Sequence, residues 1–509
     1  MAIFMMSCSK KVEIKGKVTG GDPNQRIEIT EASGVATLPL AELGVDKSGN
    51  FTGSFEVPKD GMYLLGYGQN RNLVYLKGGQ TLQISGNAMT FPTEYVITGD
   101  AKKNNDFFMA TQKHLNNFAP TVNINELMAK DEKSFVQGVQ KIEDNLKKNI
   151  EENVKKFSPD KGVVEWKNND LKATVVSILG QYEMRQKQMS GNPSYKPGKA
   201  LLDYEASMQT NKDELVKESP AYRSYLLGKM SEGFQKFATE KTKGKPNPDV
   251  TTSEMFAEYL KNDKDLSQTA KDYLLAFVMA QSDISPNTPT KTADKIKKII
   301  SENIKDAGVK KDVENLAAAI YGLKVGEVAP DVSFVKADGK SFKLSETKGK
   351  PTLVMFYASY TPYFKESALP IVKEVVNFYK SKMNFVFVSV DDTKEEFTKS
   401  GANMFKGIQG TTVYADGGLK SDAAKKFNLY GFKIPSVIVL DKDGKIASKS
   451  FFNLGEQELV DILDKQTGLK APSVDPRVQL QTGFDQHDAV PTPQAAPTPQ
   501  EAAPAPATK

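Results

Sequence analysis

Three regions with different hydrophobic patterns follow one another along the chain of 509 residues. Over residues 10–100, apolar and polar positions alternate in short runs, such as 12–18 and 26–30, which are separated by Gly, Asn and Asp. Alternation with a period of two is typical of strands with one buried face, and the separating residues favour turns. We therefore expect an antiparallel β-sandwich at residues 10–100.

Residues 101–322 show a helical period instead. Their apolar residues recur at spacings of three, four and seven, most clearly from Phe135 to Phe157. This spacing predicts an amphipathic helix. Similar patterns occur at 170–189, 220–238, 266–283 and 292–304. We expect an α-helical domain inserted between two domains that contain strands, with a solvated Lys- and Glu-rich face and with Trp166 packed on the helices.

Residues 323–470 combine both periods. Continuous apolar runs at 352–356 and 384–390 alternate with amphipathic stretches at 365–380 and before Phe427. Buried strands that alternate with helices predict βαβ units and a mostly parallel sheet covered on both faces. The run 437–446 contains an Asp-Gly pair and predicts a terminal hairpin.

The two ends of the chain differ in composition from these three domains. Residues 471–509 hold eight of the 26 prolines and eight alanines, which predicts a disordered Pro- and Ala-rich tail. Residues 1–9 contain a short apolar stretch that ends in Ser7-Cys8. This resembles the end of a lipoprotein signal peptide, so Cys8 is the expected lipid attachment site. The alternative is a cytosolic protein with an incidental apolar start.

Several landmarks of the last domain occur in a definite order. They are residues 325–331, the Lys-Gly-Lys-Pro run at 348–351, the segment from Tyr430 to Ser436, and the Asp-Lys-Asp-Gly-Lys turn at 441–445. This order resembles the redoxin group of the thioredoxin-fold superfamily, which includes TlpA-like and AhpC-TSA-like envelope proteins. The resemblance implies a thioredoxin-like fold at 323–470 and a cis bond before Pro435. Residues 10–100 resemble the β-rich domain of unknown function that precedes such domains in envelope lipoproteins.

The redox members of this group carry a Cys-x-x-Cys motif after the first buried strand. The resemblance places its two cysteines at Thr361 and Phe364. Thiol–disulfide exchange needs a thiolate and a second, resolving thiol, but the single cysteine of the chain is Cys8. We therefore expect a degenerate site with no catalytic residue and no thiol oxidoreductase activity.

The amino-acid composition argues against several kinds of site and against one class of ligand. One cysteine and two histidines leave no basis for a disulfide, a Cys-rich metal site or a Ser-His-Asp triad, and we expect neither a metal nor a cofactor. The net charge of +5 is too small and too evenly spread to indicate nucleic acid binding.

The degenerate site still has features of a binding surface. Tyr360, Thr361, Tyr363, Tyr430 and Pro435 would line an edge that binds an extended peptide by β-augmentation or stacks on a glycan. The alternative interpretation makes Tyr360 and Tyr363 ordinary surface residues, and Tyr357 and Phe364 packing residues. We expect Asp391-Asp392 to be a solvated loop end.

Three hypotheses of function follow. The first is an envelope lipoprotein, anchored in the outer membrane, whose redox-inactive domain binds an envelope protein, a peptide or a glycan. The second is a member of a thiol-redox pathway that accompanies an active paralogue. The third is a structural spacer.

Overall fold

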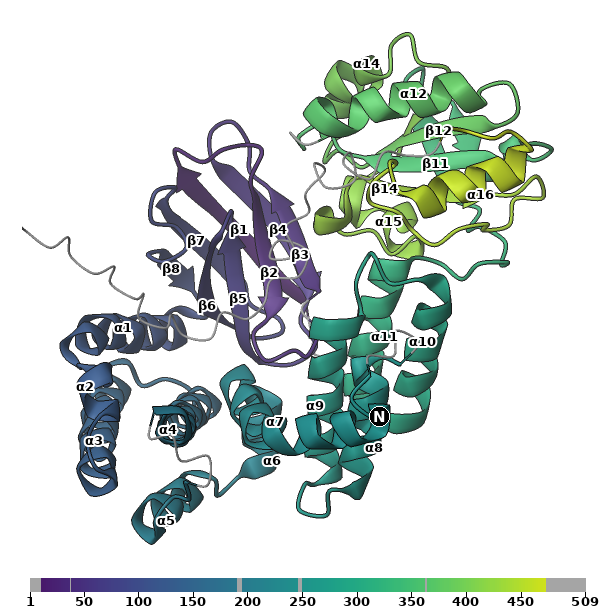
Figure 1. The fold of residues 1–509 in the computed structure, drawn as a ribbon. Coiled ribbons are helices and arrows are strands. Elements are labelled where there is room, and N and C mark those ends of the chain that lie inside the picture. Colours follow the sequence, from purple (N-terminus) through teal and green to yellow (C-terminus); the bar gives the residue numbers. More distant parts are fainter. Residues whose placement is uncertain (1–10, 37, 190–194, 246–249, 362–363, 473–509) are drawn as a thin grey trace, which may run out of the picture.

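The structure is a computed structural model that describes residues 11–36, 38–189, 195–245, 250–361 and 364–472. Strands form its first part, helices its middle, and a mixed sheet with helices its last part (Figure 1). Cys8, Tyr363 and residues 473–509 of the tail lie outside the described residues. Within the described ranges, no helix is long and apolar enough to cross a membrane.

The first part is a β-sandwich of two four-stranded sheets, in the orders β4-β1-β7-β8 and β3-β2-β5-β6. Its strands are β1 (Lys11–Thr19), β2 (Arg26–Glu31), β3 (Pro39–Gly44), β4 (Asn50–Glu56), β5 (Gly61–Tyr67), β6 (Asn70–Leu76), β7 (Thr81–Asn87) and β8 (Val96–Gly99). Inward residues such as Val12, Ile27 and Tyr63 form one core between the sheets.

The expected antiparallel arrangement is wrong for one pair of strands. β1 and β7 run parallel, with Glu13 opposite Thr81. The reason is that β6 lies in the other sheet, so the chain crosses between the sheets before β7 instead of turning back in a hairpin. The alternation of apolar and polar residues is the same in either direction, so it does not distinguish them.

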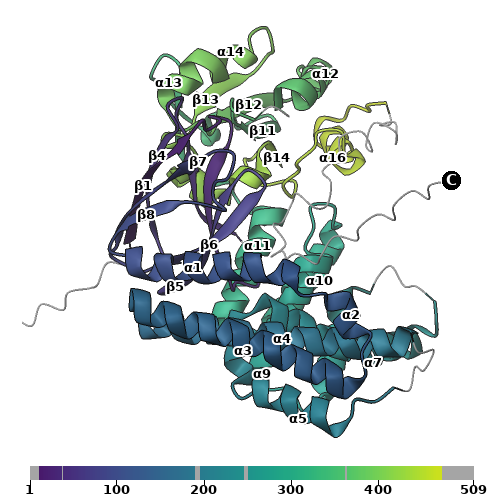
Figure 2. The ribbon, with the colours of Figure 1, turned by 90° about the vertical axis from the view of Figure 1, so that its left-hand side faces the viewer.

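Eleven α-helices occupy the described part of the middle region. They are α1 (Lys102–Phe118), α2 (Ile124–Met128), α3 (Glu132–Phe157), α4 (Lys161–Met189), α5 (Lys199–Met208), α6 (Lys212–Glu218), α7 (Pro220–Thr242), α8 (Thr252–Asn262), α9 (Gln268–Val278), α10 (Thr290–Asn303) and α11 (Ala307–Tyr321). The strongest sequence pattern, Phe135 to Phe157, lies in α3, which begins at the N-cap Asp131. Figure 2 shows α1 between the sandwich strands and the helices α3 and α4.

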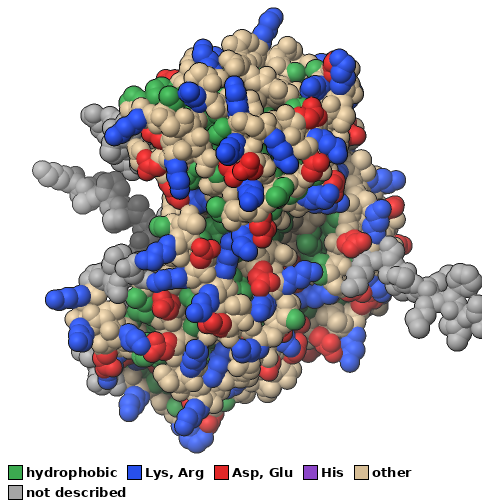
Figure 3. All heavy atoms as spheres, turned by 90° about the vertical axis from the view of Figure 1, so that its right-hand side faces the viewer, with side chains coloured by type: hydrophobic (Ala, Val, Ile, Leu, Met, Phe, Trp, Pro, Cys, Tyr) green, Lys and Arg blue, Asp and Glu red, His purple; other side chains and the backbone are tan. Residues whose placement is uncertain are grey.

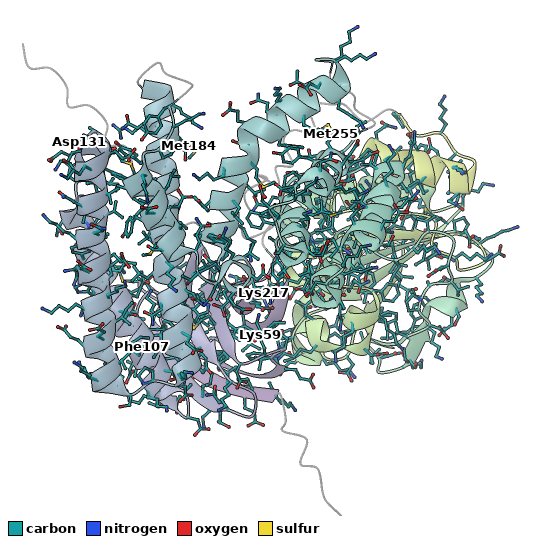
Figure 4. The ribbon with its side chains drawn as sticks, turned by 90° about the horizontal axis from the view of Figure 1, so that it is seen from below. Lys59, Phe107, Asp131, Met184, Lys217 and Met255 are labelled. Atoms are coloured by element: carbon teal, nitrogen blue, oxygen red, sulfur yellow. The ribbon has the colours of Figure 1, made fainter. Side chains whose placement is uncertain are left out.

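The helices form two cores, and both include residues of the sandwich. The first joins helices from α1 to α7 with Met62 of β5 and Tyr75 of β6. The second joins α8 to α11 with Val35, in the loop after β2. Figure 4, seen from below, labels Phe107 of α1, which belongs to the first core. The sandwich is therefore packed into the helical region rather than tethered beside it.

The last part is a six-stranded sheet in the order β10-β9-β13-β12-β11-β14, with β11, β12 and β13 parallel. Its elements are β9 (Ser333–Lys336), β10 (Ser341–Lys343), β11 (Thr352–Tyr357), α12 (Leu369–Tyr379), β12 (Asn384–Ser389), α13 (Lys394–Glu396), α14 (Ala402–Met404), β13 (Thr411–Tyr414), α15 (Asp422–Lys426), β14 (Ser436–Leu440) and α16 (Gln457–Thr467). The α12 and α16 helices cover one face, and α15 covers the other.

The predicted hairpin at 437–446 is present, although its second arm pairs only through isolated bridges such as Leu440 with Ile446. The helix predicted at 365–380 begins later as an α-helix, at Leu369, because residues 364–368 form a π-helical turn. That turn lies directly behind the loop where the sequence places the candidate site.

Candidate functional site

The candidate site begins at the end of β11. All six residues of this strand are buried, and the chain leaves it through Ser359, Tyr360 and Thr361. The Ser359 backbone N–H donates to Asp391 Oδ1 at 2.6 Å, and the Ser389 hydroxyl donates to Asp391 Oδ2 at 2.6 Å. Asp391 is completely buried, and it fixes the end of β12 against the end of β11.

Phe364 lies in the core behind this loop. Its side chain is completely buried, and its ring stacks on Tyr357 with centroids 5.3 Å apart. Phe405 contacts the rings of both residues. The side chain of Phe364 is therefore held inside the domain, where it offers no reactive group and no surface.

A second loop faces the first. A 3-10 turn (Gly431–Lys433) leads to a cis bond between Ile434 and Pro435, and β14 follows. The predicted cis state of this bond is confirmed. Tyr430 is half-buried and stacks on Phe432, whereas Pro435 is buried.

Lys433 lies two residues before Pro435 and is completely buried. Burial lowers the pKa of its ammonium group to about 7. Its Nζ atom lies 5.9 Å from the ring centroid of Phe452, and within the described residues it has no hydrogen-bond partner.

The β-sandwich covers both loops. Arg26 of β2 donates two hydrogen bonds to Asp392, Nη1 to Oδ2 at 2.8 Å and Nη2 to Oδ1 at 2.7 Å. Its guanidinium lies over the ring of Tyr360, 4.8 Å from the centroid. A bidentate guanidinium–carboxylate pair that also stacks on an aromatic ring is specific in geometry as well as in charge.

Glu42 of β3 makes the second contact. The Gly431 backbone N–H donates to both of its carboxylate oxygens, at 3.0 and 2.8 Å. Burial raises the pKa of this carboxyl to about 7, and the nearby Glu28 and Asp392 add to that shift. Burial likewise raises the pKa of the Tyr360 hydroxyl. Arg26 therefore joins the sandwich to Asp392 and to the loop of Tyr360, and Glu42 joins it to the loop of Gly431.

Comparison with known proteins identifies the last domain. Residues 325–449 match the AhpC/TSA family. Residues 325–449 form a redoxin domain of the thioredoxin fold. The chloroplastic thioredoxin-like protein HCF164 of Oryza sativa subsp. japonica is 32% identical over 112 residues, which are 22% of this chain. The chain spans 40% of the length of that relative.

Two solved structures are similar to a comparable share of the chain. The thioredoxin domain of a thiol-disulfide oxidoreductase from Bacteroides vulgatus is 24% identical, with 28% of this chain and 99% of that chain covered and a TM-score of 0.25. A thiol:disulfide interchange protein from Bacteroides sp. is 24% identical, with 29% and 92% covered and a TM-score of 0.25.

The redoxin domain brings together most of the predicted site residues that the structure describes. Tyr360 and Thr361 lie on one loop, and Tyr430 and Pro435 lie on the other. Tyr360 is not an ordinary surface residue, because Arg26 lies over its ring and its hydroxyl is buried. The side chains of Tyr357 and Phe364 pack in the core, as the alternative interpretation holds.

The expectation for Asp391 and Asp392 was wrong. Neither side chain belongs to a solvated loop end. Asp391 is buried, and Asp392 is 32% exposed and paired with Arg26. The aspartates follow an apolar strand, and sequence alone does not show that one carboxylate would bind a backbone N–H and the other a second domain.

Sequence reasoning missed the residues that cover the site. Arg26 and Glu42 occupy outward positions of strands, where charged residues usually face solvent. Lys433 also gave no signal, because lysine is common at turns.

Among the described residues, no group of three His, Cys, Asp or Glu side chains could hold a metal ion. On the face drawn in Figure 3, basic and acidic side chains are interspersed.

Proposed function

We propose that the redoxin domain is a redox-inactive protein-binding module whose former catalytic edge holds the β-sandwich of the same chain. The observation that carries this proposal is the pair of contacts at the site. Arg26 binds Asp392 and covers Tyr360, and Glu42 accepts two hydrogen bonds from the Gly431 N–H. The surface that a redox domain would offer to a substrate is thus engaged by another domain.

The residue types at the site favour binding over redox chemistry. Thr361 carries an alcohol, and Phe364 carries a buried hydrocarbon ring, at the positions that the resemblance gives to cysteines. An alcohol neither forms a disulfide nor attacks one, and the sequence has no cysteine beyond Cys8. The names of the similar proteins suggest thiol–disulfide exchange as the alternative function, in a pathway where this chain would accompany an active partner.

An activity assay separates these two functions. The full chain and its Cys8→Ser variant are tested for insulin reduction with dithiothreitol and for consumption of hydrogen peroxide. We expect both proteins to match the uncatalysed rate within about twofold, because no thiolate is present at the site. Turnover well above that rate in the Cys8→Ser variant would overturn the proposal.

Photo-crosslinking tests the binding role directly. A photoreactive residue at Thr361 should form adducts within the same chain, at residues 26–44 of the sandwich. In Gly431→Ala, an added Cβ would lie 2.2 Å from Glu42 Oε1, so we expect fewer such adducts and more adducts to other proteins. Gly61→Ala is the matched control, because a Cβ there meets nothing within 4 Å. Unchanged adducts in Gly431→Ala would contradict the proposal.

We also propose that Cys8 carries a lipid that anchors the protein in the cell envelope, with the binding module facing the periplasm or the cell surface. This part rests on the sequence pattern around Ser7-Cys8 alone. Metabolic labelling with an alkyne fatty acid should mark the wild-type protein in cells and leave Cys8→Ser unlabelled. Equal labelling of both proteins would contradict it.

A further inference from the structure

The outer face of the sheet β3-β2-β5-β6 carries an unusual row of charges. Glu42, Glu28, Gly66 and Arg71 lie side by side on the four strands. Glu28 and Glu42 are direct neighbours across β2 and β3, which places two carboxylates of like charge next to each other. Arg71 reaches across Gly66 to pair with Glu28 at 2.8 Å. A Cβ at position 66 would lie 2.8 Å from that guanidinium.

Glu42 is the charged member of this row that has no ion pair among the described residues. Arg26 is a cation near this carboxylate, but its two terminal nitrogens bind Asp392, and Nη2 also donates to the Glu42 backbone carbonyl rather than to its carboxylate. Within the part of the chain that the structure describes, the carboxylate has only the Gly431 N–H as a hydrogen-bond partner. A buried carboxylate without a cation is costly, and a proton removes that cost.

The apolar cores of the sandwich and of the redoxin domain are separate. Within the described residues, the apolar core of the sandwich shares no cluster with the two cores of the redoxin domain. One cluster does bring the two parts together, because Phe432 packs against the core of α8 to α11 that contains Val35, as do Ala36 and Leu38. Among the described residues, separating the two domains at Arg26 and Glu42 therefore draws Phe432 out of that cluster but opens neither domain's own core, so this contact is suited to open without unfolding either domain.

We propose that the β-sandwich is a detachable cover over the Tyr360 and Pro435 edge of the redoxin domain, and that ionisation of Glu42 loosens it. The sandwich shares two cores with the helices, whereas the redoxin domain meets the helical region through Phe432 and through hydrogen bonds of Lys449 and Glu458, so the redoxin domain is the part that moves. The pivot lies near Gly322, next to Tyr321, whose carbonyl accepts a hydrogen bond from the Ser450 N–H. This inference rests on the same contact as the proposed function, but not on the absence of redox activity.

The direction of the pH effect follows from linkage. The docked carboxyl has a pKa of about 7, whereas 4.5 is its ordinary value. The groups that face it are Arg26 and Glu28 on β2, Arg71 through Glu28, Asp392 after β12, and the hydroxyls of Tyr360 and Tyr430. The docked state therefore binds a proton at Glu42 more tightly than the undocked state does. Docking is weakened as the pH rises through 7. If Glu42 alone titrates, the docking constant falls on the order of 70-fold from pH 5 to pH 8.

Distance measurements on the full chain test this inference. In a Cys8→Ser background, spin labels at Lys47→Cys and Lys425→Cys report on the sandwich and the redoxin domain. Labels at Lys47→Cys and Lys148→Cys report on the sandwich and α3 as a reference pair. We expect a second, longer distance to grow from pH 5 to pH 8 in the first pair alone. Growth in both pairs would mean general loosening and would overturn the inference.

Two variants make the result decisive. Glu42→Gln keeps the shape and the side-chain carbonyl that accepts from Gly431, but it cannot ionise, so it should stay docked at both pH values. Gly431→Ala weakens docking at every pH, so it raises the undocked population into the measurable range even if the wild type stays docked. Distances in Gly431→Ala that do not change with pH, or a pH response that survives Glu42→Gln, would overturn the inference.

Discussion

One face of a single sheet meets two different neighbours in this protein. At its β5 and β6 side, the outward residues Met62, Leu64, Leu73 and Tyr75 are apolar and merge with the core of the helices. At its β3 and β2 side, the outward residues include Arg26 and Glu42, which meet the redoxin domain.

The β5 and β6 side and the β3 and β2 side show how one sheet forms both a permanent and a reversible junction. Opening an apolar contact exposes its side chains to water, and this costs the hydrophobic free energy of each of them. A contact of ion pairs and hydrogen bonds gives a smaller net free energy, because water replaces its partners. The protein therefore joins sandwich and helices as one body and leaves the redoxin domain able to release its edge.

The largest expected effect concerns the apolar side. Arg223 of α7 is completely buried and donates to the carbonyls of Ser33 and Gly34 in the loop after β2, and to Val216 and Lys217. Burial lowers the pKa of its guanidinium to about 10, which leaves it charged at neutral pH. Arg223→Ala leaves a cavity and unpaired carbonyls, and should lower the free energy of unfolding by about 3–5 kcal/mol.

Urea unfolding followed by circular dichroism measures this loss. Lys236→Ala is the matched control on the same helix, because Lys236 is exposed, and its midpoint should stay at the wild-type value. A wild-type midpoint for Arg223→Ala would mean that the sandwich and the helices are not joined through this residue.

A smaller effect is expected from a methyl group placed in the polar contact. Gly44 lies opposite Arg26, and a Cβ there would lie 2.3 Å from Asp392 Oδ2. Gly44→Ala should weaken docking by about 1–2 kcal/mol through crowding, with no loss in the unfolding of the sandwich. The spin-label pair on the sandwich and redoxin domain measures the undocked population, with Gly61→Ala as control. An undocked population equal to that of the control would contradict the predicted contact.

The smallest effect should come from the charge of Asp392. Asp392→Asn keeps one hydrogen bond to Arg26 but removes the ion pair, and since Asp392 is 32% exposed, we expect docking to weaken by about 1 kcal/mol. The loss should shrink in 0.5 M NaCl, because salt screens the wild-type pair. Glu395→Gln, which removes an exposed pair with Lys399, should change nothing measurable. A loss from Asp392→Asn that is independent of salt would mean that charge is not its cause.

Much of the fold could be predicted from periodicity. The Phe135 to Phe157 pattern predicted α3, and the buried runs predicted β11 and β12, because long amphipathic or fully apolar segments have few alternatives. The parallel pairing of β1 and β7 could not be predicted, since alternation records which face is buried and not the direction of the neighbouring strand.

The part of the site that lies within the redoxin domain could be predicted from the sequence, and the part that comes from the sandwich could not. Tyr360, Thr361, Tyr430 and Pro435 lie on the two expected loops, because the order of elements in the redoxin domain brings these loops together. Arg26 and Glu42 lie more than 300 residues away in the sequence and have the pattern of a solvated strand face. Docking between domains depends on shape and charge in three dimensions, which no local pattern records.

Two backbone amides report on the two junctions in one measurement. The Tyr75 N–H donates to Asn105 Oδ1 between sandwich and helices, and the Gly431 N–H donates to Glu42 between sandwich and redoxin domain. Hydrogen exchange of the full chain at pH 8, read by mass spectrometry on peptides that contain each amide, compares their protection. We predict exchange at least about tenfold faster at Gly431 than at Tyr75, after correction for intrinsic rates. Equal protection of the two amides would contradict the distinction between a permanent and a detachable junction.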